Sequence, residues 1–184
     1  MYEQFFGFRE RPFDLTPNPR FVVMTAAHRE ALSNLNYGIA SRKGITLLVG
    51  EAGAGKTTMI RTAMEQQASH VHVVHIQNPG LTRDEFVELL AARFELSAEA
   101  HSSKATMLLE LEALLEARAR SGETTVLIVD EAHSLPHELL EEIRLLANIE
   151  TNEQKLLSVI LAGQPELTAR LNTESLRQLK QRVA

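Results

Sequence analysis

The sequence predicts an α/β fold in which a parallel β-sheet lies between two layers of helices. Short apolar runs alternate along the chain with longer segments of helical periodicity, which is the pattern of parallel α/β architecture. The runs are almost continuously apolar, as strands buried on both faces of a sheet must be. A length of 184 residues, with 44% hydrophobic and 23% charged residues, suits one soluble domain of ordinary size. We therefore expect a single core built around the sheet.

The first 27 residues predict an extended segment that precedes this core. They hold five of the seven phenylalanines and three of the six prolines. A residue that precedes proline is disfavoured in helix, and so many aromatic rings have no use in a mobile tail. We expect residues 1–27 to form an ordered strap whose rings pack on another surface, and residues 28–184 to form the core domain.

Apolar runs predict the strands, and segments with helical periodicity predict the helices. A Thr82–Glu85 capping box marks one helix start. Met107, Leu111 and Leu115 lie on one apolar stripe of the next helix, and such a stripe packs against a core. The predicted strands are 45–49, 71–76, 125–129 and 157–162, and the predicted helices are 28–42, 56–68, 82–95, 104–120, 136–149 and 174–184.

A glycine-rich segment joins the first predicted strand to a predicted helix. It reads Gly50-Glu51-Ala52-Gly53-Ala54-Gly55-Lys56-Thr57-Thr58 and matches G-x-x-x-x-G-K-[ST], the P-loop pattern. Its glycines let backbone N–H groups point at β- and γ-phosphates, and the helix N-terminus adds positive potential. Lys56 would supply a charge to the phosphate oxygens, and the Thr57 hydroxyl would be a ligand of Mg²⁺. The alternative is a chance glycine-rich turn, which the strand and helix on either side disfavour.

Two acids, Asp130 and Glu131, directly follow the apolar run Val126 to Val129. The carboxyl ends of parallel strands line the crevice in which α/β sheets bind ligands. We expect Asp130 to hold Mg²⁺ through its water shell, and Glu131 to be the general base that orients the attacking water. The alternative is that both acids only end a strand. With the P-loop, they predict an enzyme that binds Mg-ATP and hydrolyses ATP to ADP and phosphate.

Five segments of the chain together match the motifs of a known family. They are the P-loop, Asp130-Glu131-Ala132-His133, Leu161-Ala162-Gly163-Gln164-Pro165-Glu166-Leu167, Phe5-Phe6-Gly7-Phe8-Arg9-Glu10-Arg11-Pro12-Phe13 and Pro17-Asn18-Pro19-Arg20-Phe21. On these segments the chain resembles the AAA+ ATPases, in the branch that includes general secretion pathway protein A and related transposition ATPases. The resemblance implies a P-loop NTPase three-layer sandwich in which one strand lies between the P-loop strand and the acid-bearing strand. It also implies a homo-oligomer that couples ATP to the assembly of a larger machine.

Two polar residues near strand ends acquire roles from this resemblance. Asn78, just after the strand 71–76, would restrain Glu131 until a ligand or partner releases it. A simple turn at Asn78-Pro79-Gly80 explains the same residues equally well. Gln164 would be the sensor that contacts the γ-phosphate or positions water, although AAA+ proteins more often use a shorter polar residue there.

The resemblance also implies an arginine finger near the end of the chain, which would reach the γ-phosphate of a neighbouring subunit. Arg177 and Arg182 lie in the last predicted helix, and residues five apart diverge by about 140° around a helix, so only one would face a neighbour. We prefer Arg182. The alternative is a solvated basic face that includes Lys180.

One departure from the family pattern concerns the end of the chain. AAA+ modules continue into a fifth strand and a helical lid, whereas this chain stops at Ala184, so we expect a truncated core.

A net charge of −5 leaves nucleic-acid binding open but gives it no support. The chain has no cysteine, which excludes disulfides and Cys-ligated zinc. We expect a position at the cytoplasmic face of a membrane, with secretion or envelope components as partners.

Four other interpretations compete with this one. Asp130-Glu131-Ala132-His133 also occurs in a helicase class, but a helicase needs two recombinase-like lobes, and 184 residues cannot supply both. A DNA-associated ATPase of the transposition type and an ATP-dependent switch with little hydrolysis both stay open, and Glu131 disfavours the switch. His70, His72 and His75 suggest a metal cluster, but no acids or cysteines accompany them at ligand spacing.

Overall fold

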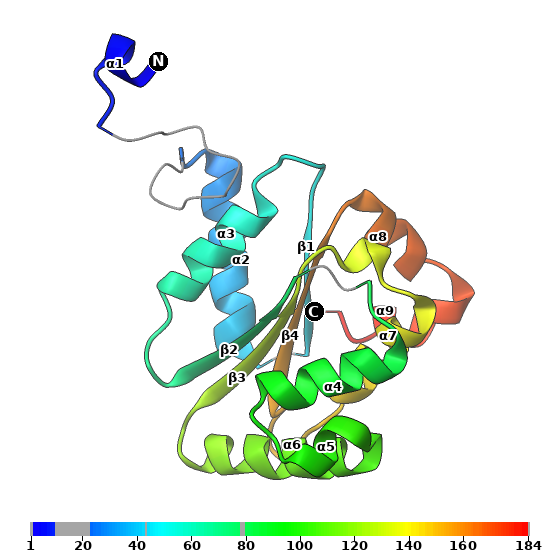
Figure 1. Ribbon diagram of the computed structural model, residues 1–184. Helices are drawn as coiled ribbons and strands as arrows, with labels where there is room; N and C mark the ends of the chain where they lie inside the picture. The colour runs from blue at the N-terminus through cyan, green and yellow to red at the C-terminus, as the bar shows by residue number, and fades with distance from the viewer. Residues whose placement is uncertain (1, 10–22, 43, 78–79, 184) are drawn as a thin grey trace.

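The structure is a computed structural model that describes residues 2–9, 23–42, 44–77 and 80–183 (Figure 1). Its sheet has four parallel strands in the spatial order β1-β4-β3-β2. β4 therefore lies between the P-loop strand β1 and the acid-bearing strand β3, which confirms the order that the family resemblance implied. The strands are β1 (Ile45–Val49), β2 (Val71–Ile76), β3 (Thr124–Val129) and β4 (Leu157–Gly163).

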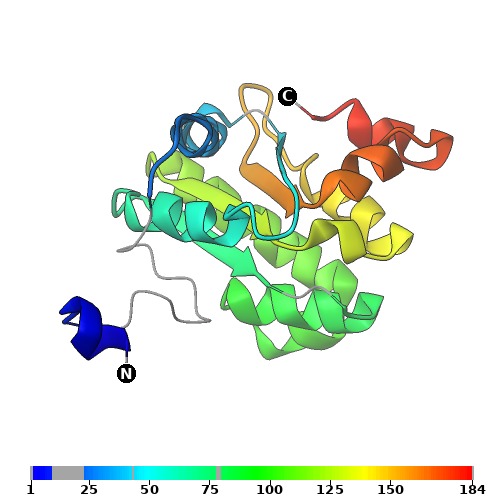
Figure 2. The same cartoon turned by 90° about the horizontal axis from the view of Figure 1, so that it is seen from above.

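Two apolar cores lie on opposite faces of this sheet. In β3, Val126 and Ile128 belong to one core, and Leu127 and Val129 belong to the other. This alternation follows from the two-residue period of a strand, and burial on both sides explains why the strand sequences are continuously apolar. Figure 2 shows the sheet with helices on its two sides. The three-layer α/β sandwich predicted from the sequence is confirmed.

Helices α2 (Ala26–Ser41) and α3 (Lys56–Glu65) cover one face, where Leu35 and Ile60 are fully buried against β3 and β4. The longer run of helices covers the other face. It consists of α4 (Arg83–Arg93), α5 (Ala98–Ser102), α6 (Lys104–Arg120), α7 (His137–Leu146), α8 (Pro165–Leu171) and α9 (Arg177–Lys180), with 3₁₀ turns at Ala132–Ser134 and Glu174–Leu176.

Local capping fixes several helix starts. The predicted capping box before α4 is present: the Thr82 backbone N–H donates to the Glu85 carboxylate at 2.8 Å, and the Glu85 N–H donates to the Thr82 hydroxyl at 3.4 Å. Within the core domain, two short helices were not predicted, α5 and α8. Each has a start signal, Ser97 as N-cap in the first and Pro165 at the first turn in the second, but neither is long enough to show helical periodicity.

The single helix predicted over 174–184 is wrong. The chain there forms a 3₁₀ turn and the four-residue α9, and Val183 then pairs in parallel with Ile45 at the edge of β1. The Ile45 N–H donates to the Arg182 carbonyl at 3.1 Å. This long-range backbone contact draws the last described residues out of helical geometry, because the edge of β1 offers unpaired backbone groups.

The amino-terminal segment differs from the extended strap that we expected. Tyr2–Phe6 forms a short helix, α1, because this stretch contains neither proline nor glycine and Glu3 favours a helix start. The Phe5 and Phe6 rings contact each other at 4.9 Å between centroids, and the two residues are 82% and 64% exposed. The proline-rich part of the strap lies outside the described residues. No helix in the described part of the chain is long and apolar enough to span a membrane.

Candidate nucleotide site

The P-loop begins where β1 leaves the sheet and ends where α3 starts. The Gly50 N–H donates to the Gly163 carbonyl at 3.1 Å, which fixes the start of the loop to the end of β4. Gly53 and Gly55 have φ values of 77° and 81°, a backbone region that glycine enters without steric cost. These two positions require glycine, and they turn the loop directly into the first turn of α3.

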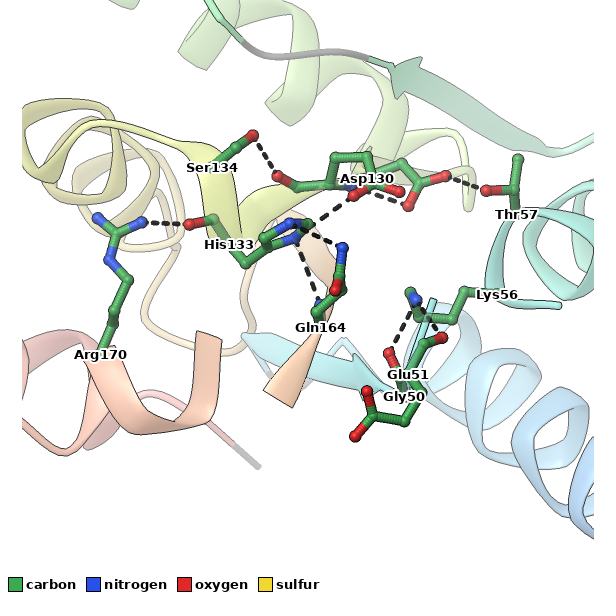
Figure 3. A network of polar contacts seen from close by, with 10 residues as sticks. Gly50, Glu51, Lys56, Thr57, Asp130, His133, Ser134, Gln164 and Arg170 are labelled. Carbon is green, nitrogen blue, oxygen red and sulfur yellow. Dashed lines mark hydrogen bonds and ion pairs between the residues drawn. The ribbon is translucent and has the colours of Figure 1, made fainter. Parts of the chain in front are cut away.

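Lys56 occupies the inside of this loop. Its residue is only 9% exposed, and its Nζ donates to the Gly50 carbonyl at 2.8 Å and to the Glu51 carbonyl at 3.0 Å (Figure 3). A nearly buried ammonium is stable only when its donors find acceptors, and the two loop carbonyls supply them. The charge of Lys56 is therefore held inside the loop.

Thr57 and Asp130 bring oxygen ligands together beside Lys56. The Thr57 Oγ1 donates to the Asp130 Oδ2 at 2.7 Å, and the Asp130 Oδ1 accepts from the Glu131 N–H at 2.9 Å. Asp130 is 3% exposed, because it follows the buried strand β3 directly. A hydroxyl and a carboxylate are the ligands that Mg²⁺ uses alongside waters and phosphates. These two side chains therefore fit the expected Mg²⁺. In the described part of the chain, no cluster of three or more His, Cys, Asp or Glu forms a separate metal site.

Glu131 has an unusual backbone that aims it at the loop. Its φ of 53° lies in the left-handed region, which costs a residue with a side chain about 1–3 kcal/mol. Glu131 lines the same cavity of about 300 Å³ as Lys56, Thr57 and Gln164. The remaining lining comes from the P-loop itself. A carboxylate with a 46% exposed side chain in such a cavity can reach a water molecule there.

His133 and Gln164 link the ends of β3 and β4 beside this cavity. The His133 Nδ1 lies 3.4 Å from the Glu131 Oε2 and 3.3 Å from the Gln164 backbone N. The Gln164 Nε2 lies 3.2 Å from the His133 Nε2, and Arg170 Nη1 donates to the His133 carbonyl at 2.6 Å (Figure 3). Sequence reasoning missed His133 and Arg170. The Asp-Glu-Ala-His run was the available signal, but Arg170 had none, because only the fold brings α8 to this turn.

A further histidine lies near the acids on the neighbouring strand. Burial lowers the pKa of His75 below its usual value of 6.5, although the charge of Asp130 opposes this shift. The His75 Nε2 has no hydrogen-bond partner among the described residues. His72, three residues earlier, instead pairs with Glu123 at 2.9 Å. The two histidines thus have separate environments and do not form a shared metal site.

The predicted site residues divide into three groups. The P-loop, Asp130, Glu131 and Gln164 meet at one edge of the sheet, as the sequence predicted. Arg177 and Arg182 are exposed and do not line this cavity. Arg182 lies beside Ile45, at the amino end of β1, whereas the P-loop follows the carboxyl end. Asn78 lies outside the described residues.

The fold and the site together define a P-loop nucleotide-binding domain of the AAA+ type. A family model described as "AAA domain" matches residues 39–171, and the chain belongs to this family. Two solved archaeal structures share the fold. The ORC2 protein of Aeropyrum pernix, in ADPNP-ADP complexes, has a TM-score of 0.64 and 16% identity over 95% of this chain and 50% of its own. Cdc6p of Pyrobaculum aerophilum has a TM-score of 0.60 and 18% identity over 90% and 47%.

Two curated proteins are similar in sequence. General secretion pathway protein A of Aeromonas hydrophila is 41% identical over 183 residues, which is 100% of this chain and 34% of that protein. The Mu-like prophage FluMu DNA transposition protein B of Haemophilus influenzae is 29% identical over 153 residues, 83% of this chain and 48% of that protein. The chain thus spans about a third and about a half of these relatives. The similarity to these two kinds of protein that the sequence motifs indicated is confirmed.

Proposed function

We propose that this domain binds Mg-ATP, hydrolyses it to ADP and phosphate, and uses the cycle to assemble or remodel a larger complex. The observation that carries the proposal is the meeting of Lys56, the Thr57–Asp130 pair and Glu131 around one cavity. Lys56 supplies a positive charge for the phosphates, Thr57 and Asp130 supply ligands for a cation, and Glu131 supplies a base. Phosphoryl transfer to water requires these groups.

In the proposed binding step, Lys56 exchanges its two carbonyl partners for oxygens of the β- and γ-phosphates. The P-loop N–H groups donate to the same phosphates, and the amino end of α3 adds a favourable dipole. Thr57 and Asp130 are the residues that would hold Mg²⁺, which would supply positive charge to the phosphate oxygens. The Thr57 hydroxyl and the Asp130 carboxylate lie 2.7 Å apart, so one cation could take an oxygen ligand from each.

In the proposed chemical step, the Glu131 carboxylate accepts a proton from the water that attacks the γ-phosphate. The left-handed backbone of Glu131 and the cavity position of its side chain support this role. Gln164, which lines the same cavity, donates its amide N–H to the γ-phosphate or to the attacking water. General-base catalysis of this kind contributes about 10²–10⁴-fold to a rate.

We further propose that copies of the chain act together in a secretion or envelope machine on the cytoplasmic side. Arg182 lies at the amino end of β1 and not at its own P-loop, so an arginine finger at this position would serve a neighbouring subunit. Similarity to general secretion pathway protein A supports the secretion client. Similarity to the transposition protein supports a second candidate, a DNA-associated ATPase. Strong stimulation of turnover by DNA favours that second candidate, and absence of stimulation favours the first.

The direct test of hydrolysis compares steady-state Mg-ATP turnover of the wild type with that of Glu131→Gln. The amide keeps the size of the side chain and removes the base, so turnover should fall about 10²-fold or more while Mg-ATP affinity is retained. Glu88→Gln, at an exposed position on α4, is the matched control and should turn over ATP as the wild type does. Unchanged turnover in Glu131→Gln would exclude Glu131 as the base.

A further inference from the structure

We propose that His133 is a positioning residue that holds either Glu131 or Gln164 through one ring nitrogen, and so sets whether the site is ready for hydrolysis. The inference rests on the proposed function, since it assigns Glu131 as the base and Gln164 as the sensor. His133 contacts Glu131 and Gln164 but does not line the cavity. It therefore acts through these two residues and does not contact the substrate.

The Nδ1 of His133 has two competing partners. It is 3.4 Å from the Glu131 Oε2 and 3.3 Å from the Gln164 backbone N. With a proton on Nδ1, the ring donates to the Glu131 carboxylate and cannot accept from the Gln164 N–H. Without that proton, Nδ1 accepts the Gln164 N–H and leaves the carboxylate unheld. A neutral imidazole therefore satisfies one partner at a time.

The other ring nitrogen transmits this choice to the Gln164 side chain. The His133 Nε2 lies 3.2 Å from the terminal amide of Gln164. When Nδ1 carries the proton, Nε2 is an acceptor and takes an amide N–H. When Nε2 carries it, Gln164 must present its amide oxygen to the ring, which turns its amino group toward the cavity. The second arrangement frees the Glu131 carboxylate and aims a donor at the γ-phosphate, so it is the one suited to hydrolysis.

The surroundings of His133 hold its ring in place, so only the proton on the ring changes position. The Arg170 Nη1 donates to the His133 carbonyl at 2.6 Å. Gly163 lets the turn approach closely, since a Cβ there would lie 3.1 Å from the His133 N and 3.4 Å from its Cβ. The His133 side chain is only 18% exposed. These contacts fix the imidazole between the ends of β3 and β4.

The spectroscopic test reads the tautomer directly by ¹⁵N NMR of the histidine rings, with and without a non-hydrolysable Mg-ATP analogue. The His133 signals are assigned by their loss in His133→Asn. We expect the Nδ1–H form without nucleotide and the Nε2–H form with the analogue. The same tautomer in both states overturns the proposal, and this readout needs no catalytic activity.

The kinetic test uses two variants that each keep one ring position. Asn places its amide near Nδ1 and Gln places its amide near Nε2. His133→Gln, which can still hold the Gln164 amide, should keep kcat within about threefold of wild type, and His133→Asn should lose about tenfold or more, in both cases with KM for ATP unchanged. The exposed His137, changed to Ala, is the control.

Equal kcat losses in the Asn and Gln variants, or wild-type kcat in both, overturn the positioning role. The Glu131→Gln variant separates this failure from failure of the proposed function. If Glu131→Gln loses turnover while both His133 variants keep it, hydrolysis stands and only the positioning role falls. If Glu131→Gln also keeps turnover, the assignment of Glu131 as the base falls, and only a wild type without Mg-ATP turnover overturns the proposed function itself.

Discussion

Gly163 sits where β4 meets the turn that follows Glu131, and replacing it with Ala tests that contact. The added Cβ would lie 3.1 Å from the His133 backbone N and 3.2 Å from the Leu167 Cδ2. The nearer neighbour is backbone, and the carbonyl of the same residue is held by Arg170 at 2.6 Å. Because this contact holds the turn in place, relieving the clash costs free energy, and the added methyl group should displace His133.

The magnitude follows from two opposing terms. Overpacking a tight site costs about 1–3 kcal/mol, and exchanging Gly for Ala returns about 0.4–1 kcal/mol through the unfolded chain. The free energy of unfolding should therefore fall by about 1–2 kcal/mol, measured as a lower urea midpoint with an unchanged m-value. ATP turnover should fall about tenfold as well, since displacing His133 disturbs Glu131 and Gln164 together.

Gly38→Ala is the control that separates strain from catalysis. A Cβ at Gly38 would lie 2.6 Å from the Thr46 Oγ1, between α2 and β1 and away from the cavity. This variant should also lose stability but keep its turnover per folded molecule. A Gly163→Ala variant with wild-type stability and turnover would refute the close-approach argument.

Three further predictions concern single side chains. Thr57→Ala removes the 2.7 Å hydrogen bond to the Asp130 carboxylate, so unfolding free energy should fall by about 1.5–3 kcal/mol, and Mg²⁺ titrations should show a weaker gain in ATP affinity. Burial lowers the pKa of His75, so the unfolded state binds its proton first as pH falls below 6.5. The free energy of unfolding should therefore fall as the pH drops from 6.5 toward the lower pKa of His75 in the folded state. Urea curves of His75→Phe should show a smaller loss of this free energy at acid pH. Arg182→Ala should remove any rise of turnover with protein concentration, an effect of about 10³-fold or more, without weakening ATP binding.

The strands were predictable because burial on both faces leaves a signal in every short run. The predicted 45–49 and 71–76 match β1 and β2, and the other two strands differ by one residue each. Short helices such as α8 were not predictable, since seven residues are too few for helical periodicity. The helix predicted over 174–184 was wrong for another reason: Val183 pairs with Ile45, which is far away in sequence.

The site divides along the same line. Lys56, Thr57 and Asp130 belong to local motifs, and the structure places them together as their spacing predicted. The contact between His133 and Gln164 joins residues 31 positions apart, and the parallel pairing of β3 with β4 creates it. No local pattern encodes such a contact, so sequence reasoning recognised Gln164 by resemblance and did not find its partner.

Calorimetric titration of Mg-ATP into the wild type and Lys56→Ala shows whether the P-loop holds the ATP phosphates. Lys180→Ala, at an exposed position on α9, is the charge-matched control. Circular dichroism and urea curves establish that each variant is folded. We predict that the wild type and Lys180→Ala bind with equal affinity and that Lys56→Ala loses about 100-fold or more, since it removes the charge that faces the phosphates. Near-native affinity in folded Lys56→Ala would contradict the assignment of the phosphate site.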